Sequence, residues 1–177
     1  MALTSNSISR LLGRAVVLEN PSAAWPLLVL RTVVGVGFIA HGLAKLHSGP
    51  AGFARLLGQI GVPFSLETAW MVTLLELGGG VALILGAFVL LASLPLIASM
   101  LVAMFSVQWR YGYSSVKTIG LTNAGPVFGP PGYEINLLYI ACLVVLVLLG
   151  PGMLSIDYLL ARGRLQKAIH SRSRSPL

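Results

Sequence analysis

The hydrophobic pattern of this chain consists of long apolar runs separated by short polar segments. Residues 77–109 contain no Asp, Glu, Lys, Arg or His, and the same holds for residues 135–156. A membrane-spanning helix needs roughly 20 apolar residues, so the first stretch, extended back to Ala69, is long enough for two helices. The pattern predicts an all-α fold, a bundle of four transmembrane helices. These helices are expected near residues 25–46, 67–86, 89–108 and 134–150.

Composition and charge support a multi-pass membrane protein. The chain of 177 residues is 56% hydrophobic and 10% charged, whereas soluble domains average about 25% charged residues. The net charge of +7 could indicate a nucleic-acid partner, but the distribution of charge argues against one. Seven of the twelve basic residues lie on the two tails. Four helices place both tails on one side, which the positive-inside rule makes cytoplasmic.

The segments between and around the helices have different expected roles. Residues 1–24 lack a cleavable signal sequence and are expected to form a cytoplasmic, interfacial lead-in. The outer loop at 47–66 predicts a short surface helix from Phe53 to Ile60. The outer loop at 109–133 is long and aromatic, and we expect it to form an ordered cap. Residues 161–177 are expected to form a basic, flexible cytoplasmic tail.

A few ionisable residues interrupt the apolar runs, and such residues mark functional sites in membrane proteins. His41 and Lys45 lie four residues apart and share a helix face. Glu76 is the lone carboxylate of the second run. Counting from the outer surface, His41 lies about 9 Å deep and Glu76 about 13 Å deep.

Polar and aromatic residues from the other two helices are expected at the same outer level. Gln108 and Trp109 end the third helix, and Tyr133 and Glu134 open the fourth. One interpretation is a pocket beneath the 109–133 loop, in which His41, Glu76 and Lys45 act on a small redox ligand such as a quinone. The other is a buried ion pair, Glu76 with Lys45 or with protonated His41, that ties two helices together. Both can hold at once.

Other features are interpreted as structural. Arg31, two turns into the first helix, is expected to reach Asp157 at the cytoplasmic surface. The glycines at 35, 37 and 78–80 are expected to give smooth faces for close helix packing. The lone cysteine, Cys142, excludes an internal disulfide and an iron–sulfur site. One histidine at depth does not support a haem, and the acidic and histidine residues do not indicate a metal site.

Several short motifs together resemble the DoxX family of small bacterial membrane proteins. They are Arg31 with Gly35, HGLAKL at 41–46, Gly52-Phe53, Gly61-Val62-Pro63, Glu76-Leu77-Gly78-Gly79, Gly132-Tyr133-Glu134, and the segment from Gly150-Pro151-Gly152 to Ser155-Ile156-Asp157. The resemblance covers roughly residues 27–160. It implies one four-helix domain in a bacterial inner membrane that is linked to redox work.

Three classes of function follow from these features. The first is a membrane subunit of a quinone-linked oxidoreductase, with Gln108, Trp109, Tyr133 and Glu134 helping to bind the quinone and with electrons supplied by a partner or by substrate. The second is a non-catalytic anchor that recruits soluble redox or stress-defence proteins through the 109–133 loop or the basic tail. The third, a solute transporter, has little support, since no inverted repeat or broken helix is evident. A homo-oligomer is compatible with each.

Overall fold

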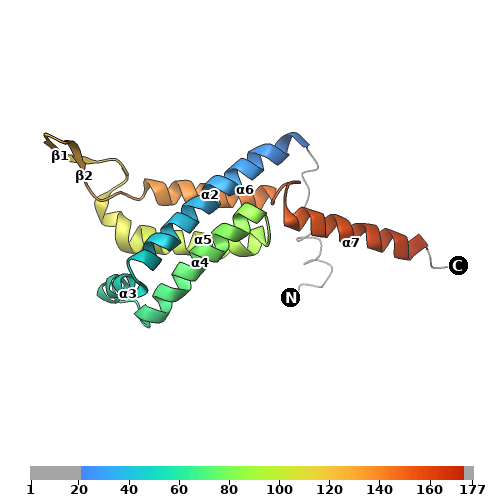
Figure 1. Ribbon diagram of the computed structural model, residues 1–177, viewed down its shortest axis with the longest axis horizontal. Coiled ribbons are helices and arrows are strands. Elements are labelled where there is room, and N and C mark those ends of the chain that lie inside the picture. Colours follow the sequence, from blue (N-terminus) through green and yellow to red (C-terminus); the bar gives the residue numbers. More distant parts are fainter. Residues whose placement is uncertain (1–20, 174–177) are drawn as a thin grey trace, which may run out of the picture.

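The computed structural model describes residues 21–173, and the lead-in expected at residues 1–20 lies outside this range. Antiparallel helices form an elongated bundle, and both the start of the first helix and the last helix lie at the same end (Figure 1). We call this the α7 end and the opposite one the α3 end. The helical elements are α2 (Pro21–His47), α3 (Pro50–Gln59), α4 (Ser65–Leu85), α5 (Val89–Ala103), the π-helical turn η1 (Met104–Gln108), the 3₁₀ turn η2 (Trp109–Tyr111), α6 (Glu134–Leu149) and α7 (Ile156–Ser173).

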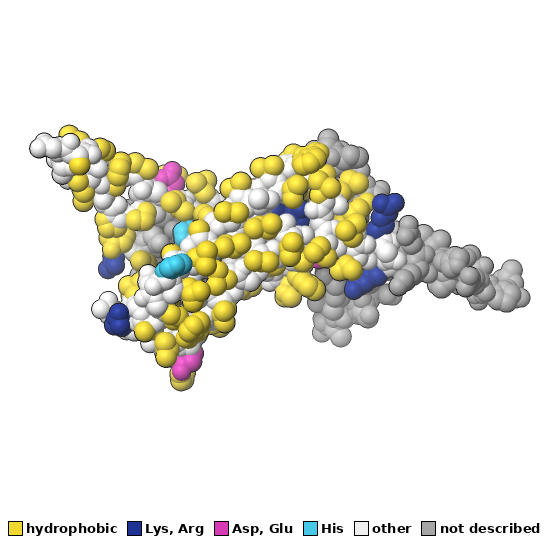
Figure 2. All heavy atoms as spheres, viewed as in Figure 1, with side chains coloured by type: hydrophobic (Ala, Val, Ile, Leu, Met, Phe, Trp, Pro, Cys, Tyr) yellow, Lys and Arg dark blue, Asp and Glu magenta, His cyan; other side chains and the backbone are white. Residues whose placement is uncertain are grey.

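The predicted all-α membrane bundle is confirmed. Three helical stretches, Ala24–His47, Ser65–Leu85 and Val89–Tyr111, are long and apolar enough to cross a membrane. The fourth, α6, is also apolar but has 16 residues, which gives a length of about 24 Å. Apolar side chains cover the sides of the bundle (Figure 2). A surface of this kind suits contact with lipid, where polar groups would be costly.

The closest helix pair in the bundle is α2 with α4, and glycines make it possible. A Cβ added at Gly35 would lie 2.6 Å from the backbone oxygen of Gly80, and the reverse contact is equally tight. Gly42 leaves similar room for Leu77. Small residues let helix backbones approach closely in membranes. The structure therefore confirms the predicted smooth faces at Gly35 and Gly80.

The apolar core lies toward the middle and the α7 end of the bundle. It is built from all four long helices, and most of its members are Leu, Val or Phe. Its buried residues are Leu27, Val34, Phe38, Leu83, Val89, Leu96, Met100, Leu143 and Leu146.

At the α7 end, Asp157 binds backbone groups. Its carboxylate oxygens accept hydrogen bonds from the backbone N–H groups of Phe88 (2.8 Å) and Val89 (2.9 Å), at the start of α5. Its own backbone N–H donates to the Gly86 carbonyl oxygen at 3.0 Å. An acidic residue is favourable there, because the first N–H groups of a helix lack partners within it. Asp157 thus ties α7 to the α4–α5 turn.

The expected Arg31–Asp157 ion pair is not formed, which corrects the sequence interpretation. Arg31 is fully buried and donates from Nη2 to the Leu154 carbonyl oxygen at 2.5 Å. The side chain folds inward because Gly86, which has no Cβ, leaves space for the guanidinium. The carboxylate of Asp157 is already engaged by the start of α5.

The C-terminal segment also differs from expectation. Residues 161–173, expected to be part of a flexible tail, continue α7 as far as Ser173. Leu, Ala, Arg, Gln and Lys, which dominate this segment, are all good helix formers. Residues 174–177 lie outside the described range.

The 109–133 loop is ordered, as expected, but it contains strands that the all-α prediction missed. Strand β1 (Thr118–Thr122) pairs antiparallel with β2 (Gly125–Phe128). The hairpin extends away from the bundle at the α3 end (Figure 1), and every residue of β1 is exposed. This loop therefore does not close over the bundle as a cap.

Candidate functional site

A buried ion pair lies between α2 and α4 toward the α3 end. The Lys45 ammonium contacts the Glu76 carboxylate. The Glu76 side chain is 3% exposed and that of Lys45 is 21% exposed. The approach of the two helices at Gly42 and Leu77 brings these side chains together. One of the two predicted pairings of Glu76, the one with Lys45, is therefore the one formed.

The cover over this ion pair is α3. The Lys45 Nζ atom lies 5.3 Å from the centre of the Phe53 ring, a cation–π contact. Ala54 and Leu57 of α3 are buried against Ala69 of α4. The amphipathic segment predicted at 53–60 is thus a longer helix that shields Lys45, a role expected of the 109–133 loop.

His41 lies on the same face of α2 as Lys45, one turn closer to the middle of the bundle, and its side chain is exposed on the outside. Its ring is edge-on to the ring of Tyr139 of α6, with centres 5.8 Å apart. Histidine side chains are open on the face of the molecule shown in Figure 2. His41 therefore lies on the outside of the bundle, one helical turn from the ion pair and against α6.

Tyr139 is a polar residue at this place that the sequence analysis did not single out. It is half-buried, and its ring also meets Phe38 edge-on at 5.0 Å. Its hydroxyl lies against Gly37, where there is no room for a Cβ atom. Glycine at 37 is the sequence signal that could have pointed to a large partner side chain.

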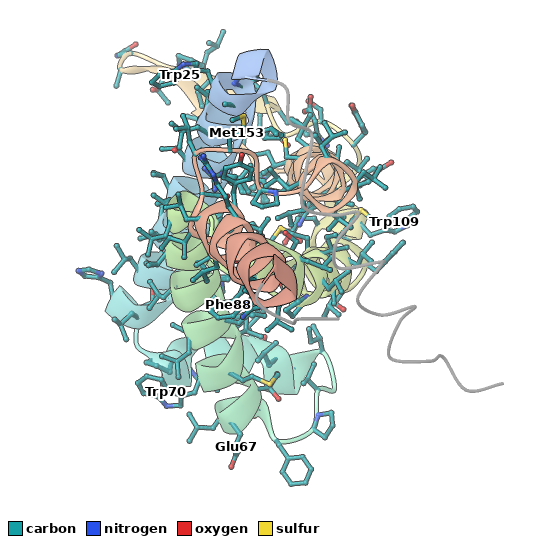
Figure 3. All side chains as sticks on the ribbon, turned by 90° about the vertical axis from the view of Figure 1, so that its right-hand side faces the viewer. Trp25, Glu67, Trp70, Phe88, Trp109 and Met153 are labelled. Atoms are coloured by element: carbon teal, nitrogen blue, oxygen red, sulfur yellow. The ribbon has the colours of Figure 1, made fainter. Side chains whose placement is uncertain are left out.

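The predicted binding residues Trp109 and Tyr133 form a separate group. Their rings are stacked, with centres 5.0 Å apart, and Tyr113 meets Tyr133 edge-on at 5.6 Å. Trp109 is 54% exposed and points away from the bundle, on a different side from Trp70 (Figure 3). The π-helical turn η1 precedes Trp109. A π turn contains more residues than an α turn, so it changes the face on which later residues lie.

Glu134 and Gln108 also have local surroundings of their own. Glu134 accepts a hydrogen bond from the Ser115 backbone N–H at 3.0 Å, which fixes the base of the 109–133 loop to α6. The Gln108 side-chain oxygen is buried and has no hydrogen-bond partner among the described residues. The structure therefore pairs Lys45 with Glu76 and places His41 one turn away on α2, and no printed contact joins Gln108, Trp109, Tyr133 or Glu134 to these three residues.

Comparison with known proteins gives one match. The DoxX family model matches residues 26–109, which run from α2 to the start of η2. Residues 26–109 form a DoxX domain. No curated protein and no solved structure matches the chain significantly.

The DoxX match contains the whole ion-pair site, since His41, Lys45 and Glu76 all lie within it. Tyr139 lies beyond it, on α6. Within residues 21–173 of the chain, no group of three or more His, Cys, Asp or Glu side chains could hold a metal ion. The chemistry that the site offers is hydrogen bonding and proton exchange by an imidazole, a carboxylate and an ammonium group.

Proposed function

We propose that this protein is the integral membrane subunit of a quinone-linked oxidoreductase in a bacterial inner membrane. The observation that carries the proposal is the position of His41. This side chain is open on the lipid-facing side of α2, one turn from the buried Glu76–Lys45 pair. A quinone is a lipid-soluble ligand with two hydrogen-bond acceptors, and it would reach this place from within the membrane.

Each residue of the site would have its own role in binding the quinone and transferring protons. His41 donates a hydrogen bond to a quinone carbonyl and passes a proton to it. Glu76 serves as the next proton carrier, and Lys45 holds its carboxylate in place through the ion pair. A quinone supplies the capacity to take up two electrons and two protons. The electrons come from a partner oxidoreductase or directly from a substrate.

The half-buried Tyr139 ring, which packs beside His41, gives part of the apolar surroundings that a quinone ring needs. Gln108, Trp109, Tyr133 and Glu134, predicted to bind the quinone, lie at the α3 ends of α5 and α6. We propose that these four residues instead form part of the outer surface of the protein. Trp109 and Tyr133 are suited to headgroup depth, where aromatic side chains are enriched.

The test is purification in mild detergent from native membranes, with mass spectrometry of co-purified proteins and extracted quinones. The wild-type protein is expected to carry quinone and an oxidoreductase partner. His41→Ala should lower bound quinone about fivefold, the effect of one lost hydrogen bond, and Glu76→Gln should slow quinone reduction by the assembly. His47→Ala and Glu67→Gln are matched controls on the same helices. Quinone-free wild-type protein, or variants indistinguishable from their controls, would refute the proposal.

A second candidate function is a membrane anchor that recruits a soluble redox protein, and α7 favours it. This helix is tied to the bundle by Asp157 and projects beyond its end (Figure 1). Leu159 and Leu160 are exposed beside Arg162 and Arg164. Deleting residues 162–177 should abolish partner recruitment if α7 is the docking element. Retained recruitment would count against the anchor role of α7.

A further inference from the structure

The hairpin of the 109–133 loop carries an apolar surface that no described part of the chain covers. Every residue of β1 is exposed, and so are three of the four residues of β2. Leu121 lies opposite Pro126 in the hairpin register, and Phe128 follows two residues later, so these three side chains share one face. Leu121 is 82% exposed and Phe128 is 58% exposed, and hydrophobic side chains are open on the hairpin in Figure 2. We call these three side chains the apolar face.

The base of the hairpin is fixed to the bundle, so the hairpin has a set direction. Below the strands, the backbone N–H of Gly129 donates to the Lys117 carbonyl oxygen at 2.8 Å, and that of Gly132 donates to the Ser114 carbonyl oxygen at 3.0 Å. This base joins the end of η2 to the start of α6, where the long apolar helices end. From there the hairpin extends obliquely to one side of the bundle (Figure 1). A hairpin in this direction would lie over the lipid beside the bundle.

A row of aromatic rings connects the lipid-facing side of the bundle to this base. The Phe105 ring, which is 60% exposed within the membrane-spanning stretch Val89–Tyr111, has its centre 5.4 Å from that of Trp109. Trp109 stacks on Tyr133, and Tyr133 meets Tyr113. Tryptophan and tyrosine are enriched at the depth of the lipid headgroups. The apolar side of the bundle therefore continues into the hairpin through rings suited to the membrane surface.

The charges of the loop indicate which surface the apolar face meets. Residues 109–133 contain Arg110 and Lys117 and no Asp or Glu, and both basic side chains are exposed. An apolar face with basic neighbours suits a leaflet that contains negatively charged lipids, because its apolar side chains enter the acyl boundary while the basic ones meet phosphates. An isolated two-stranded hairpin is at best marginally stable in water, so cover of this kind would also stabilise the strands.

We propose that the hairpin is an interfacial anchor that docks its apolar face on the lipid leaflet at the α3 end. Arg110 and Lys117 contact the phosphates of negatively charged lipids, and Leu121 and Phe128 lie below the headgroups. The turn at Asn123 stays in water. Interfacial anchors set how a bundle is tilted and rotated in the membrane, so the docked hairpin would hold the bundle in one orientation. This inference does not depend on quinone binding.

The experiment uses the full-length protein, one copy per nanodisc, in an equal mixture of phosphatidylglycerol and phosphatidylcholine. In a Cys142→Ser background, Thr118→Cys carries a fluorescent probe opposite Phe128 and leaves the apolar face intact. A nitroxide on the lipid acyl chain quenches the docked probe, whereas iodide quenches the undocked probe from water. The two quenchers together give the ratio of docked to undocked hairpin. The Thr118 probe is expected to be quenched by lipid, and the same probe at Arg164→Cys on α7 by iodide.

A first pair of variants tests the apolar contact. Leu121→Thr should lower the ratio about tenfold, the effect of returning one leucine side chain to water. Val127→Thr is the matched control, because Val127 lies opposite Gly120 on the other face, and it should leave the ratio unchanged. Threonine favours strands, so both variants retain the hairpin.

A second pair tests the charge. Lys117→Gln should lower the ratio about fivefold in the mixed discs, the contribution of one basic residue at an anionic surface. It should have no effect in discs of phosphatidylcholine alone. Arg164→Gln, at the α7 end, is the matched control and should have no effect in either lipid.

Four results would overturn the inference. A Thr118 probe as open to iodide as the Arg164 probe would show that the hairpin stands in water. Protection that requires two copies per disc would show an interface between copies in place of a lipid contact. An equal loss in Leu121→Thr and Val127→Thr would refute the role of the apolar face. An equal ratio in both lipids would refute the role of negatively charged lipids.

Discussion

At the scale of single residues, the most important contact is the ion pair between two charged side chains inside an apolar bundle. The sequence limited the expected partner of Glu76 to Lys45 or His41, because depths on two neighbouring helices can be counted from the loops, and the structure shows that Lys45 is the partner. The sequence could not identify Tyr139. A tyrosine in an apolar helix is ordinary, and its contact with Gly37 depends on how α6 is rotated about its own axis.

The Lys45–Glu76 pair should contribute to stability. Lys45→Met leaves the buried Glu76 carboxylate without a partner, and breaking a buried pair costs about 3 kcal/mol or more. We expect a clear fall in the thermal unfolding midpoint in detergent, measured by circular dichroism. The double variant Lys45→Met with Glu76→Gln should recover most of the loss, because it removes both charges.

Lys117→Met, at an exposed position of the 109–133 loop, is the matched control and should leave the midpoint unchanged. A double variant no more stable than Lys45→Met alone would show that the two charges do not depend on each other.

At the scale of elements, charge-free runs predicted the four long helices to within a few residues, since lipid requires continuous apolar helices of fixed length. The strands of the hairpin were missed because β1 and β2 are short and pack on nothing that would impose an alternating pattern. The α4–α5 turn was located correctly at residues 86–88. The turn contains no charged residue, and the carboxylate that binds the start of α5 comes from Asp157, far along the chain, which no local pattern in the sequence could reveal.

Asp157 is predicted to hold the start of α5. Asp157→Ala removes the acceptor for two backbone N–H groups, and losing a helix cap costs about 1 kcal/mol. Amide hydrogen exchange should therefore speed up at residues 88–92 and along the start of α7. Glu67→Ala, an acidic residue in the first turn of α4 with an exposed side chain, should not change exchange in α5. Unchanged exchange at Phe88 and Val89 would contradict the capping role.

At the scale of the whole molecule, the structure divides the predicted outer site in two. One half is the Lys45–Glu76 ion pair, between α2 and α4 and under α3, with His41 one turn along α2 and against Tyr139 of α6. The other is the aromatic group around Trp109 and Tyr133. The depth of a residue along a helix can be counted from the sequence. The direction in which its side chain points cannot be counted once a π-helical turn intervenes. The DoxX resemblance and the four-helix architecture were recognisable from the sequence because short motifs and apolar lengths are both local properties.

The whole-molecule account predicts that the α3 end faces outward and the α7 end faces the cytoplasm. In a Cys142→Ser background, Asn123→Cys in the hairpin turn should react with a membrane-impermeant maleimide added to intact cells. Arg164→Cys on α7 should react only after the cells are opened. The reverse pattern would invert the topology, and labelling of both positions in intact cells would contradict a fold with its two ends on opposite sides.

The central claim is that a quinone binds at His41 on the α2 face of the bundle. It is tested most directly by photolabelling the protein in nanodiscs with an azidoquinone, followed by peptide mapping with mass spectrometry. The account predicts label within residues 36–45 of α2 and 136–143 of α6, and this label should disappear when unmodified quinone is added in excess. Label confined to the aromatic group near Trp109, or label that excess quinone does not displace, would contradict it.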